Sequence, residues 1–138
     1  MRITVKPVAA FLAMLSLAAP VAAQRAPSFA GVWRNAADSV RIRVAPCGQG
    51  SLCGRVVSAS AKAREDAARG GTDELVGTEL LHDFQRDEDG MWHGQVYVPD
   101  IDKTFDGTLE LADRDTLVAT GCLFGRLGCR SQSWKRVR

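Results

Sequence analysis

Short stretches with the alternation of a β-strand follow one another along most of this chain, and turn residues separate them about every ten residues. Residues 40–44 alternate between apolar side chains and arginine, as expected of a strand with one buried face. The clearest hairpin joins residues 79–86 to residues 91–98 through an Asp-Glu-Asp-Gly turn. About eight such strands predict an all-β fold, which is either an antiparallel up-and-down barrel or a sandwich.

One segment departs from this strand pattern. Residues 61–75 are rich in alanine and charged residues, and they include the pair Gly70-Gly71. Alanine and charged residues favour a helix, whereas paired glycines favour a turn. We therefore expect a short helical or irregular insertion around residues 61–75.

The first residues have the composition of an export signal. Two cationic residues precede an uncharged apolar stretch at residues 8–19, and a small-residue cleavage site ends at Ala23. The apolar stretch is shorter than the roughly 20 residues that a membrane-spanning helix needs. We predict a signal peptide at residues 1–23, cleaved after Ala23, and a single domain at residues 24–138. The mature protein is expected to be periplasmic or secreted and to contain no transmembrane segment.

The charge balance argues against one broad class of function. The chain has 18 Lys and Arg residues against 16 Asp and Glu residues, and two of the cations fall within the predicted signal peptide. The mature chain is therefore neutral, whereas a general nucleic-acid binder needs an excess of cations to neutralise phosphates. We expect no nucleic-acid partner.

The cysteines occur as two local pairs. Cys47 and Cys53 flank one glycine-containing turn, and Cys122 and Cys129 flank another. In an oxidising compartment an even number of cysteines indicates disulfides, and residues that face each other across a turn are within bridging range. The local pairing is therefore favoured, although a crossed pairing remains open.

The two ends of the mature chain carry residues that can close a barrel. Gly31 and Trp33 lie near its start, and Trp134 and Arg136 lie near its end. In a closed sheet the first and last strands are neighbours, so the Trp33 indole can cover one end of the barrel with the Arg136 guanidinium across it. A Gly-x-Trp start with a late arginine resembles the lipocalin and wider calycin proteins, in which that pair plugs the closed end. The resemblance implies a lipocalin-like β-barrel, with these four residues in structural roles.

A longer series of motifs is similar to the bacterial domain of unknown function 2147 family. In chain order the motifs are Gly31-x-Trp33, Cys47-Gly48, Leu52-Cys53-Gly54, residues 77–84, Trp92-x-Gly94, Val98-Pro99-Asp100, Gly121-Cys122 and residues 129–136. Together they span nearly all of the mature chain. The resemblance implies an exported lipocalin-like barrel and no established activity.

The sequence offers no catalytic or metal site. No nucleophile can be paired with a base, and no pair of catalytic carboxylates or phosphate loop is recognisable. The cysteine spacings differ from those of zinc sites, and Phe105 stands where a calcium loop starting at Asp100 needs glycine. In the predicted hairpin His82 and His93 are roughly 13 Å apart, too far to share an ion. We expect no enzyme activity, no metal and no cofactor.

Aromatic and imidazole side chains are the candidates for a ligand site inside the barrel. His82 alternates with Leu80 and Phe84, so it can point inward, either as a structural histidine or as a group that orients a ligand. A two-residue turn at Asp89-Gly90 would place Tyr97 opposite His82. Trp92 can either pack in the core or form a pocket wall. The candidate ligand-binding residues are His82, Phe84, Trp92, Tyr97 and Phe105.

Basic residues gather near both ends of the mature chain, whereas acidic residues gather between positions 65 and 115. Barrel closure would bring the basic residues together as a cationic seam suited to an anionic envelope component, unless they are simply solvated outward positions. The residues of this predicted seam are Arg34, Arg41, Arg43, Arg55, Arg126, Arg130, Lys135, Arg136 and Arg138.

Two functions therefore remain open at the level of sequence. The first is a carrier that holds a small apolar or amphipathic ligand inside the barrel. The second is an envelope interaction protein whose barrel is filled and which acts through its surface loops and the cationic seam. A continuous apolar cavity would favour the first function, and a packed interior would favour the second.

Overall fold

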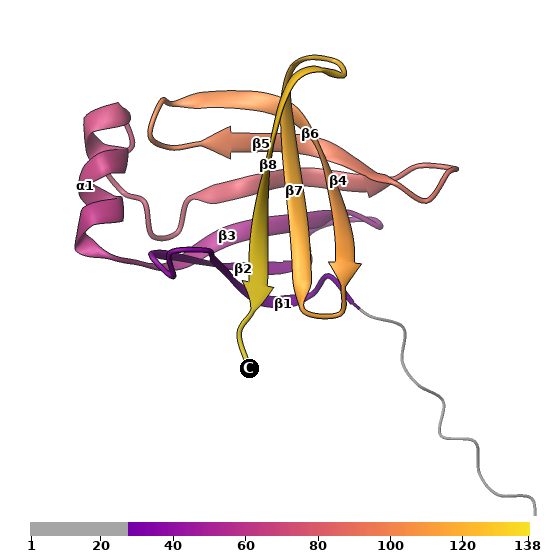
Figure 1. The fold of residues 1–138 in the computed structure, drawn as a ribbon, viewed down its shortest axis with the longest axis horizontal. Helices are drawn as coiled ribbons and strands as arrows, with labels where there is room; N and C mark the ends of the chain where they lie inside the picture. The colour runs from indigo at the N-terminus through magenta and orange to yellow at the C-terminus, as the bar shows by residue number, and fades with distance from the viewer. Residues whose placement is uncertain (1–27) are drawn as a thin grey trace, which may run out of the picture.

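The computed structural model describes residues 28–138. The predicted signal peptide at residues 1–23 and its cleavage after Ala23 lie outside the described residues. Eight antiparallel strands form a closed barrel in which each strand pairs with the next along the chain and β8 pairs with β1 (Figure 1). The prediction of an antiparallel up-and-down barrel is confirmed. The elements are β1 (Gly31–Asn35), β2 (Val40–Pro46), β3 (Leu52–Ala59), α1 (Ala61–Gly70), β4 (Glu79–Arg86), β5 (Trp92–Val98), β6 (Lys103–Asp113), β7 (Thr116–Phe124) and β8 (Leu127–Arg136).

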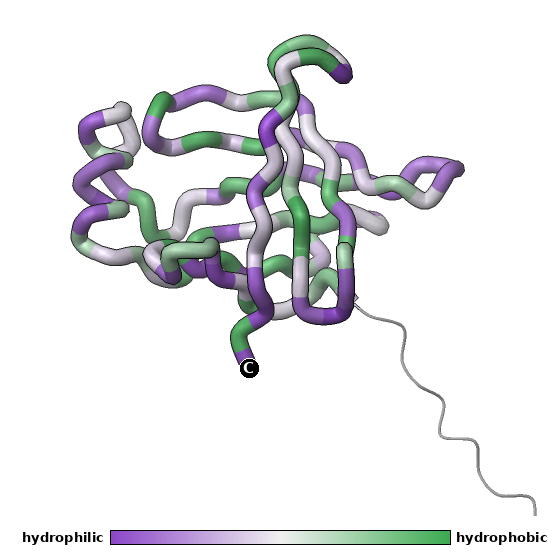
Figure 2. Tube along the Cα trace, viewed as in Figure 1, coloured by the Kyte–Doolittle hydropathy of each residue, from purple (hydrophilic) through white to green (hydrophobic). Residues whose placement is uncertain are grey.

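Alternating hydrophobic and hydrophilic residues along the strands decide which side chains fill the barrel (Figure 2). In β2, Ile42 and Val44 are buried, while Arg43 between them is exposed. The same alternation places Leu117 and Ala119 of β7 inside. The core therefore follows directly from the period of two in the sequence.

One end of the barrel is plugged by Trp33 and Arg136. Trp33 is fully buried, and its indole Nε1 donates a hydrogen bond to the Phe29 carbonyl at 2.9 Å. The Arg136 guanidinium lies 4.1 Å from the centre of the Trp33 ring and donates hydrogen bonds to the carbonyls of Ser28 and Ala30. Gly31 has a φ of 141°, and a Cβ there would lie only 2.8 Å from the arginine. The glycine thus allows the chain entering β1 to pass close to the arginine of β8.

A bulge in β4 changes which residues face inward. Asp83 has a φ of 44°, and the strand gains one residue relative to β5 between His82 and Gln85. Phe84 is therefore fully buried on the same side as Leu81, whereas the expected alternation would have placed it with His82. His82 pairs with Gln95 instead of Tyr97, so the predicted hairpin register is wrong.

A hydrogen bond holds the bulge against the β2–β3 turn. The Ser51 hydroxyl donates to Asp83 Oδ1 at 2.6 Å, and this bond, followed by a weaker one from Gln85, lowers the pKa of the Asp83 carboxyl below its ordinary value. A lowered carboxyl pKa stabilises the fold above the ordinary pKa, and this contribution disappears as the pH falls through the lowered pKa.

We expect Ser51→Ala to lower the urea midpoint at pH 7 and to have a smaller effect in acid, at a pH below the lowered pKa of Asp83, where the carboxyl is protonated in both proteins. Urea denaturation at the two pH values measures the difference. Ser58→Ala, at an exposed position of β3, serves as the control and should change neither midpoint. An equal loss at both pH values for Ser51→Ala would show that the charged form of Asp83 is not what the hydroxyl stabilises.

Both disulfides have the local pairing that the sequence favoured. Cys47 is bonded to Cys53 across the β2–β3 turn, and Cys122 is bonded to Cys129 across the β7–β8 turn. Pairing of β2 with β3 continues to Pro46 and Leu52, directly beside the first bridge. Each bridge therefore fixes the shape of a turn at the end of two strands.

The insertion around residues 61–75 begins with a regular helix, α1. The Ser60 side chain caps it by accepting a hydrogen bond from the Ala63 N–H, and Gly71 ends it with a φ of 114°. A Cβ at Gly70 would lie 1.9 Å from the Asp100 carbonyl oxygen, which shows how closely the last turn of α1 approaches the β5–β6 turn. No helix within residues 28–138 is long and apolar enough to cross a membrane.

Candidate ligand cavity

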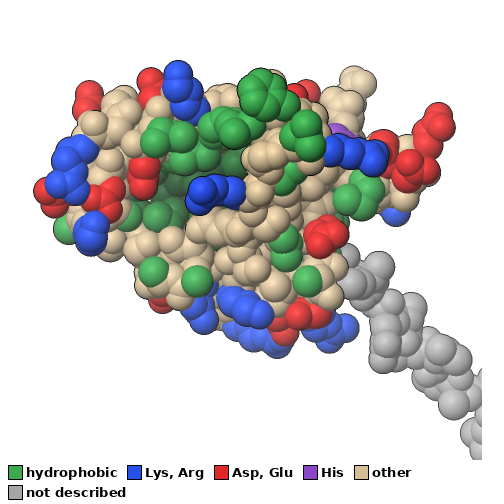
Figure 3. Space-filling model, turned by 45° about the horizontal axis from the view of Figure 1, so that its top comes forward, with side chains coloured by type: hydrophobic (Ala, Val, Ile, Leu, Met, Phe, Trp, Pro, Cys, Tyr) green, Lys and Arg blue, Asp and Glu red, His purple; other side chains and the backbone are tan. Residues whose placement is uncertain are grey.

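The barrel interior is hollow at the end opposite Trp33. A cavity of about 740 Å³ opens there between α1, the β5–β6 turn and the β7–β8 hairpin. Figure 3 shows the opening as a hollow lined by hydrophobic side chains, with a basic side chain lying across it. The barrel is therefore filled at its plugged end and open at the other, so a fully filled barrel does not describe it.

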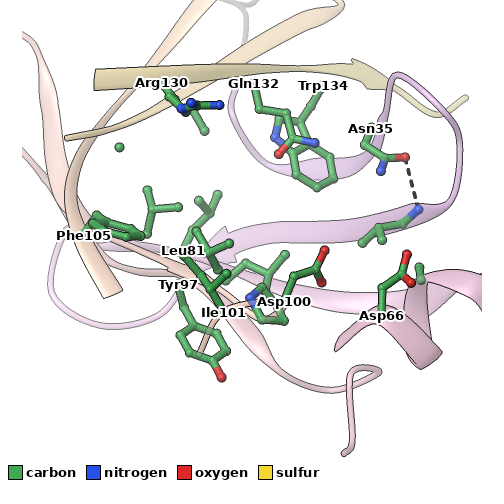
Figure 4. A pocket seen from close by; sticks show the side chains of 18 of the residues that line it. Asn35, Asp66, Leu81, Tyr97, Asp100, Ile101, Phe105, Arg130, Gln132 and Trp134 are labelled. Atoms are coloured by element: carbon green, nitrogen blue, oxygen red, sulfur yellow. Dashed lines mark hydrogen bonds between the residues drawn. The ribbon is translucent and has the colours of Figure 1, made fainter. Parts of the chain in front are cut away.

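Apolar side chains from the strands and from the loops at the mouth form most of the cavity wall. Phe105, Leu81 and Ile101 face the hollow in Figure 4, and the Trp134 ring extends into it from β8. The apolar lining residues are Val40, Ala63, Leu75, Leu80, Leu81, Val96, Val98, Pro99, Ile101, Phe105, Ala119, Leu123 and Trp134. Such a wall favours the hydrocarbon part of a ligand.

Most polar groups at the mouth are already engaged with other protein groups. The Asn35 amide bonds the Ser39 hydroxyl and the backbone N–H groups of Ser39 and Val40. Lys62 of α1 lies 2.6 Å from Asp66, which also pairs with Arg69. The Lys62 and Arg69 hydrogen bonds lower the pKa of Asp66. The charges of Lys62 and Asp66 are therefore already compensated within the protein.

Arg130 is different. It lies on β8 with its guanidinium beside the cavity, in the row that continues to Gln132 and Trp134 (Figure 4). Among the residues from 28 to 138 it makes neither an ion pair nor a side-chain hydrogen bond, in contrast to Arg41, Arg55 and Arg136. Asp100, in the β5–β6 turn, is the corresponding carboxylate without an ion pair within the described residues. The mouth thus has one available cation and one available anion.

Of the five candidate ligand-binding residues, Phe105 lines the cavity and points into it (Figure 4). Tyr97 borders the cavity, but its ring points away, and its hydroxyl is hydrogen-bonded to Thr72 and Asp102, both at 2.7 Å. The remaining three residues, His82, Phe84 and Trp92, do not line the cavity.

The expected inward orientation of His82 is corrected by the bulge at Asp83. The imidazole is partly exposed on the outside of the barrel, where its Nδ1 lies 3.1 Å from Glu79 Oε1. Phe84 packs in the core at the level of Gly94, where a Cβ would lie 2.7 Å from its ring. Trp92 stacks at a tilt on Phe29, with ring centres 5.6 Å apart, toward the plugged end. Within the described chain no group of His, Cys, Asp and Glu side chains is arranged to bind a metal.

The predicted cationic seam divides into separate groups. Arg34 is the cross-strand neighbour of both Arg41 and Lys135, and Arg43 is the neighbour of Arg55, so basic residues do meet across the β8–β1–β2–β3 surface. Arg130 faces the cavity mouth instead of this surface. Arg126 lies in the β7–β8 turn, Arg136 covers Trp33, and Arg138 pairs with Asp115 at 2.7 Å. The alternation of β8 explains the division, because Lys135 and Arg130 point to opposite faces of the strand.

Comparison with known proteins supports this architecture. A family model described as "Uncharacterized protein conserved in bacteria (DUF2147)" matches residues 31–136, which includes every strand. Among solved structures, one described as "Protein HP1028 from the human pathogen Helicobacter pylori belongs to the lipocalin family" is similar, with a TM-score of 0.61 and 13% sequence identity. The similarity covers 82% of this chain and 85% of that chain. No curated protein shows significant sequence similarity to the chain.

Proposed function

We propose, from the premise that this chain belongs to the DUF2147 family and has a lipocalin-like barrel with one open end, that it binds an amphipathic molecule with an acidic headgroup in its cavity. The hydrocarbon part lies within the apolar wall, and the headgroup lies at the mouth beside Arg130. The volume of about 740 Å³ falls within the usual range of small-molecule pockets. The observation that carries the proposal is the unpaired Arg130 at the edge of a cavity whose wall is mostly apolar.

An acidic headgroup suits Arg130 for a physical reason. A planar guanidinium offers parallel N–H donors that match a carboxylate, and such charge-assisted hydrogen bonds are stronger than neutral ones. A cation beside an apolar wall also attracts an anion more strongly than one surrounded by water. The adjacent Gln132 adds a neutral polar side chain that can bond the same headgroup.

The proposal includes an oxidising location, either the periplasm or the exterior of the cell. Two disulfides, with no free cysteine among the described residues, support it because such bridges persist in oxidising compartments. The predicted signal peptide at residues 1–23 agrees with this location. The role proposed for the site is binding and carriage, without catalysis.

Replacing Arg130 with glutamine should weaken binding of the fluorescent fatty acid cis-parinaric acid about tenfold, because the headgroup loses its cation. Binding of a neutral alcohol of the same chain length should change much less. Fluorescence titration measures both affinities. Asp100→Asn is the matched control: removing the carboxylate at the mouth should leave fatty-acid affinity unchanged or raise it. Equal losses for acid and alcohol in R130Q would rule out the headgroup role, and absence of binding to the unmodified protein would rule out the function.

A further inference from the structure

The tip of the β7–β8 hairpin exposes an unusual amount of hydrophobic surface. Phe124 is 76% exposed, Leu127 is 71% exposed and Leu123 is 59% exposed, the highest values of any large hydrophobic side chain from 28 to 138. The hairpin projects beyond the rest of the barrel at the top of Figure 1, and in Figure 2 its tip is largely green (hydrophobic) with a purple (hydrophilic) segment at its end. These side chains, Leu123, Phe124 and Leu127, are called the apolar tip below.

The apolar tip is held outward by covalent and hydrogen-bonded structure. The Cys122–Cys129 disulfide joins the two strands directly below it, and Thr120 and Ser131 are hydrogen-bonded at 2.7 Å further down. Gly125 and Gly128 have φ values of 56° and 64°, which allow the tight turn between the strands. The disulfide and the hydrogen bond hold the two strands together at the base of the apolar tip. Their exposure is thus part of the folded shape.

The charged side chains within the β7–β8 hairpin itself are cationic, whereas the nearest acidic residues belong to β6 and the β5–β6 turn. Between residues 123 and 130 the only charged side chains are Arg126, in the turn itself, and Arg130, at the cavity mouth. Hydrophobic side chains flanked by cations are typical of segments that lie in the interface of an anionic membrane. Leu123 also lines the cavity, so the apolar tip adjoins the cavity mouth directly. Ile101 is a further exposed hydrophobic residue at the mouth.

We propose that the apolar tip inserts into the surface of an anionic phospholipid membrane, with Arg126 against the lipid headgroups and the cavity mouth facing the bilayer. A second copy of the chain is a poorer occupant. One aromatic side chain buries at most about 250 Å² and a leucine buries less, so one phenylalanine and two leucines stay below the roughly 800 Å² per partner of a stable protein interface. A bilayer, by contrast, accepts a narrow apolar projection without a complementary surface. This inference goes beyond ligand binding and does not depend on it.

Vesicle co-sedimentation tests the proposal. The unmodified protein should bind phosphatidylcholine vesicles containing phosphatidylglycerol, and the double variant Phe124→Ser, Leu127→Ser should bind them at least about tenfold more weakly. The matched control is Val57→Ser, Val76→Ser, which removes two exposed hydrophobic residues outside the hairpin and should bind normally. Arg126→Gln should weaken binding to the anionic vesicles and have little effect on pure phosphatidylcholine vesicles. Equal thermal midpoints for these proteins would show that folding is unaffected.

Insertion of the apolar tip into the bilayer can be measured separately by tryptophan fluorescence. Tryptophan introduced by Phe124→Trp should be quenched by brominated lipids more than the tryptophans of the unmodified protein. Failure of the unmodified protein to bind anionic vesicles, or unchanged binding by the double serine variant, would overturn the proposal. So would a dimer of the unmodified protein that the double serine variant converts to monomer without a change in vesicle binding. Gly121→Phe, which places a phenyl ring in the cavity, should still bind vesicles. This result separates failure of the membrane proposal from failure of the ligand-binding proposal.

Discussion

Gly121→Phe should abolish binding of amphipathic ligands while leaving the barrel folded. Gly121 lies on β7 in the cavity wall, and a Cβ there would meet the Cβ atoms of Phe105 at 3.6 Å and Val96 at 3.9 Å, which are ordinary contact distances. The phenyl ring would therefore occupy the part of the cavity where the ligand is proposed to bind. We expect the affinity for cis-parinaric acid to fall at least about 100-fold, measured by fluorescence titration.

The choice of glycine matters for this experiment. At Gly94 a Cβ would lie 2.6 Å from the His82 carbonyl oxygen, and at Gly107 it would lie 2.6 Å from the Thr120 carbonyl oxygen. A larger side chain at either position would push the neighbouring strand away. A loss of ligand binding could then not be distinguished from a loss of folding. Val118→Phe is the matched control, because Val118 alternates with Leu117 and Ala119 and therefore points to the outer face of the same strand. Retained affinity in G121F would show that the ligand binds elsewhere.

The barrel could be predicted from the sequence because its determinants are local. Each strand has its own period-two pattern, and each cysteine pair flanks its own turn. Closure required one long-range inference, that Trp33 and Arg136 lie on neighbouring strands, and the structure pairs these two residues directly. The sequence supported that inference because both residue types have a physical reason to meet at a barrel end.

The ligand site could be predicted only in part, and the bulge at Asp83 is the main reason. A single residue inserted into one strand reverses the side on which the following residues lie, so an alternation counted from Phe84 places His82 wrongly inside. Nothing in the local sequence marks Asp83 as the bulge. Aspartate tolerates a positive φ in many settings, and the Ser51 hydroxyl that holds the bulge comes from a turn far away in the chain.

Arg130, in contrast, could have been found. A structural role is expected for Trp134, and if its ring fills the barrel the period of two places Gln132 and Arg130 on the same inner face. Arg130 is instead part of the predicted cationic seam, because it lies near the end of the chain with other basic residues. The register of Arg130 with the buried Trp134 is therefore enough to place it beside the barrel interior.

Trp33→Ala should cause the largest loss of stability of any substitution considered above. Removing a fully buried tryptophan typically costs about 3–5 kcal/mol, against a total of about 5–15 kcal/mol for a domain of ordinary stability. The variant also loses the indole hydrogen bond to Phe29 and the ring over which Arg136 lies. Urea denaturation should show a much lower midpoint with little change in slope.

Two comparisons identify the cause of that loss. Trp33→Phe keeps a ring beneath Arg136 and should lose clearly less stability, and it provides a folded variant if Trp33→Ala does not fold. Trp92→Ala removes a partly exposed tryptophan that stacks on Phe29 and should cost less than Trp33→Ala. Ligand affinity measured on folded Trp33→Phe should remain close to that of the unmodified protein, because the plug and the cavity mouth lie at opposite ends of the barrel. If Trp33→Ala and Trp92→Ala cost the same, the plug would have no special role in closing the barrel. A selective loss for Trp33 would mean that the closed end supplies stability and leaves the open end free to bind.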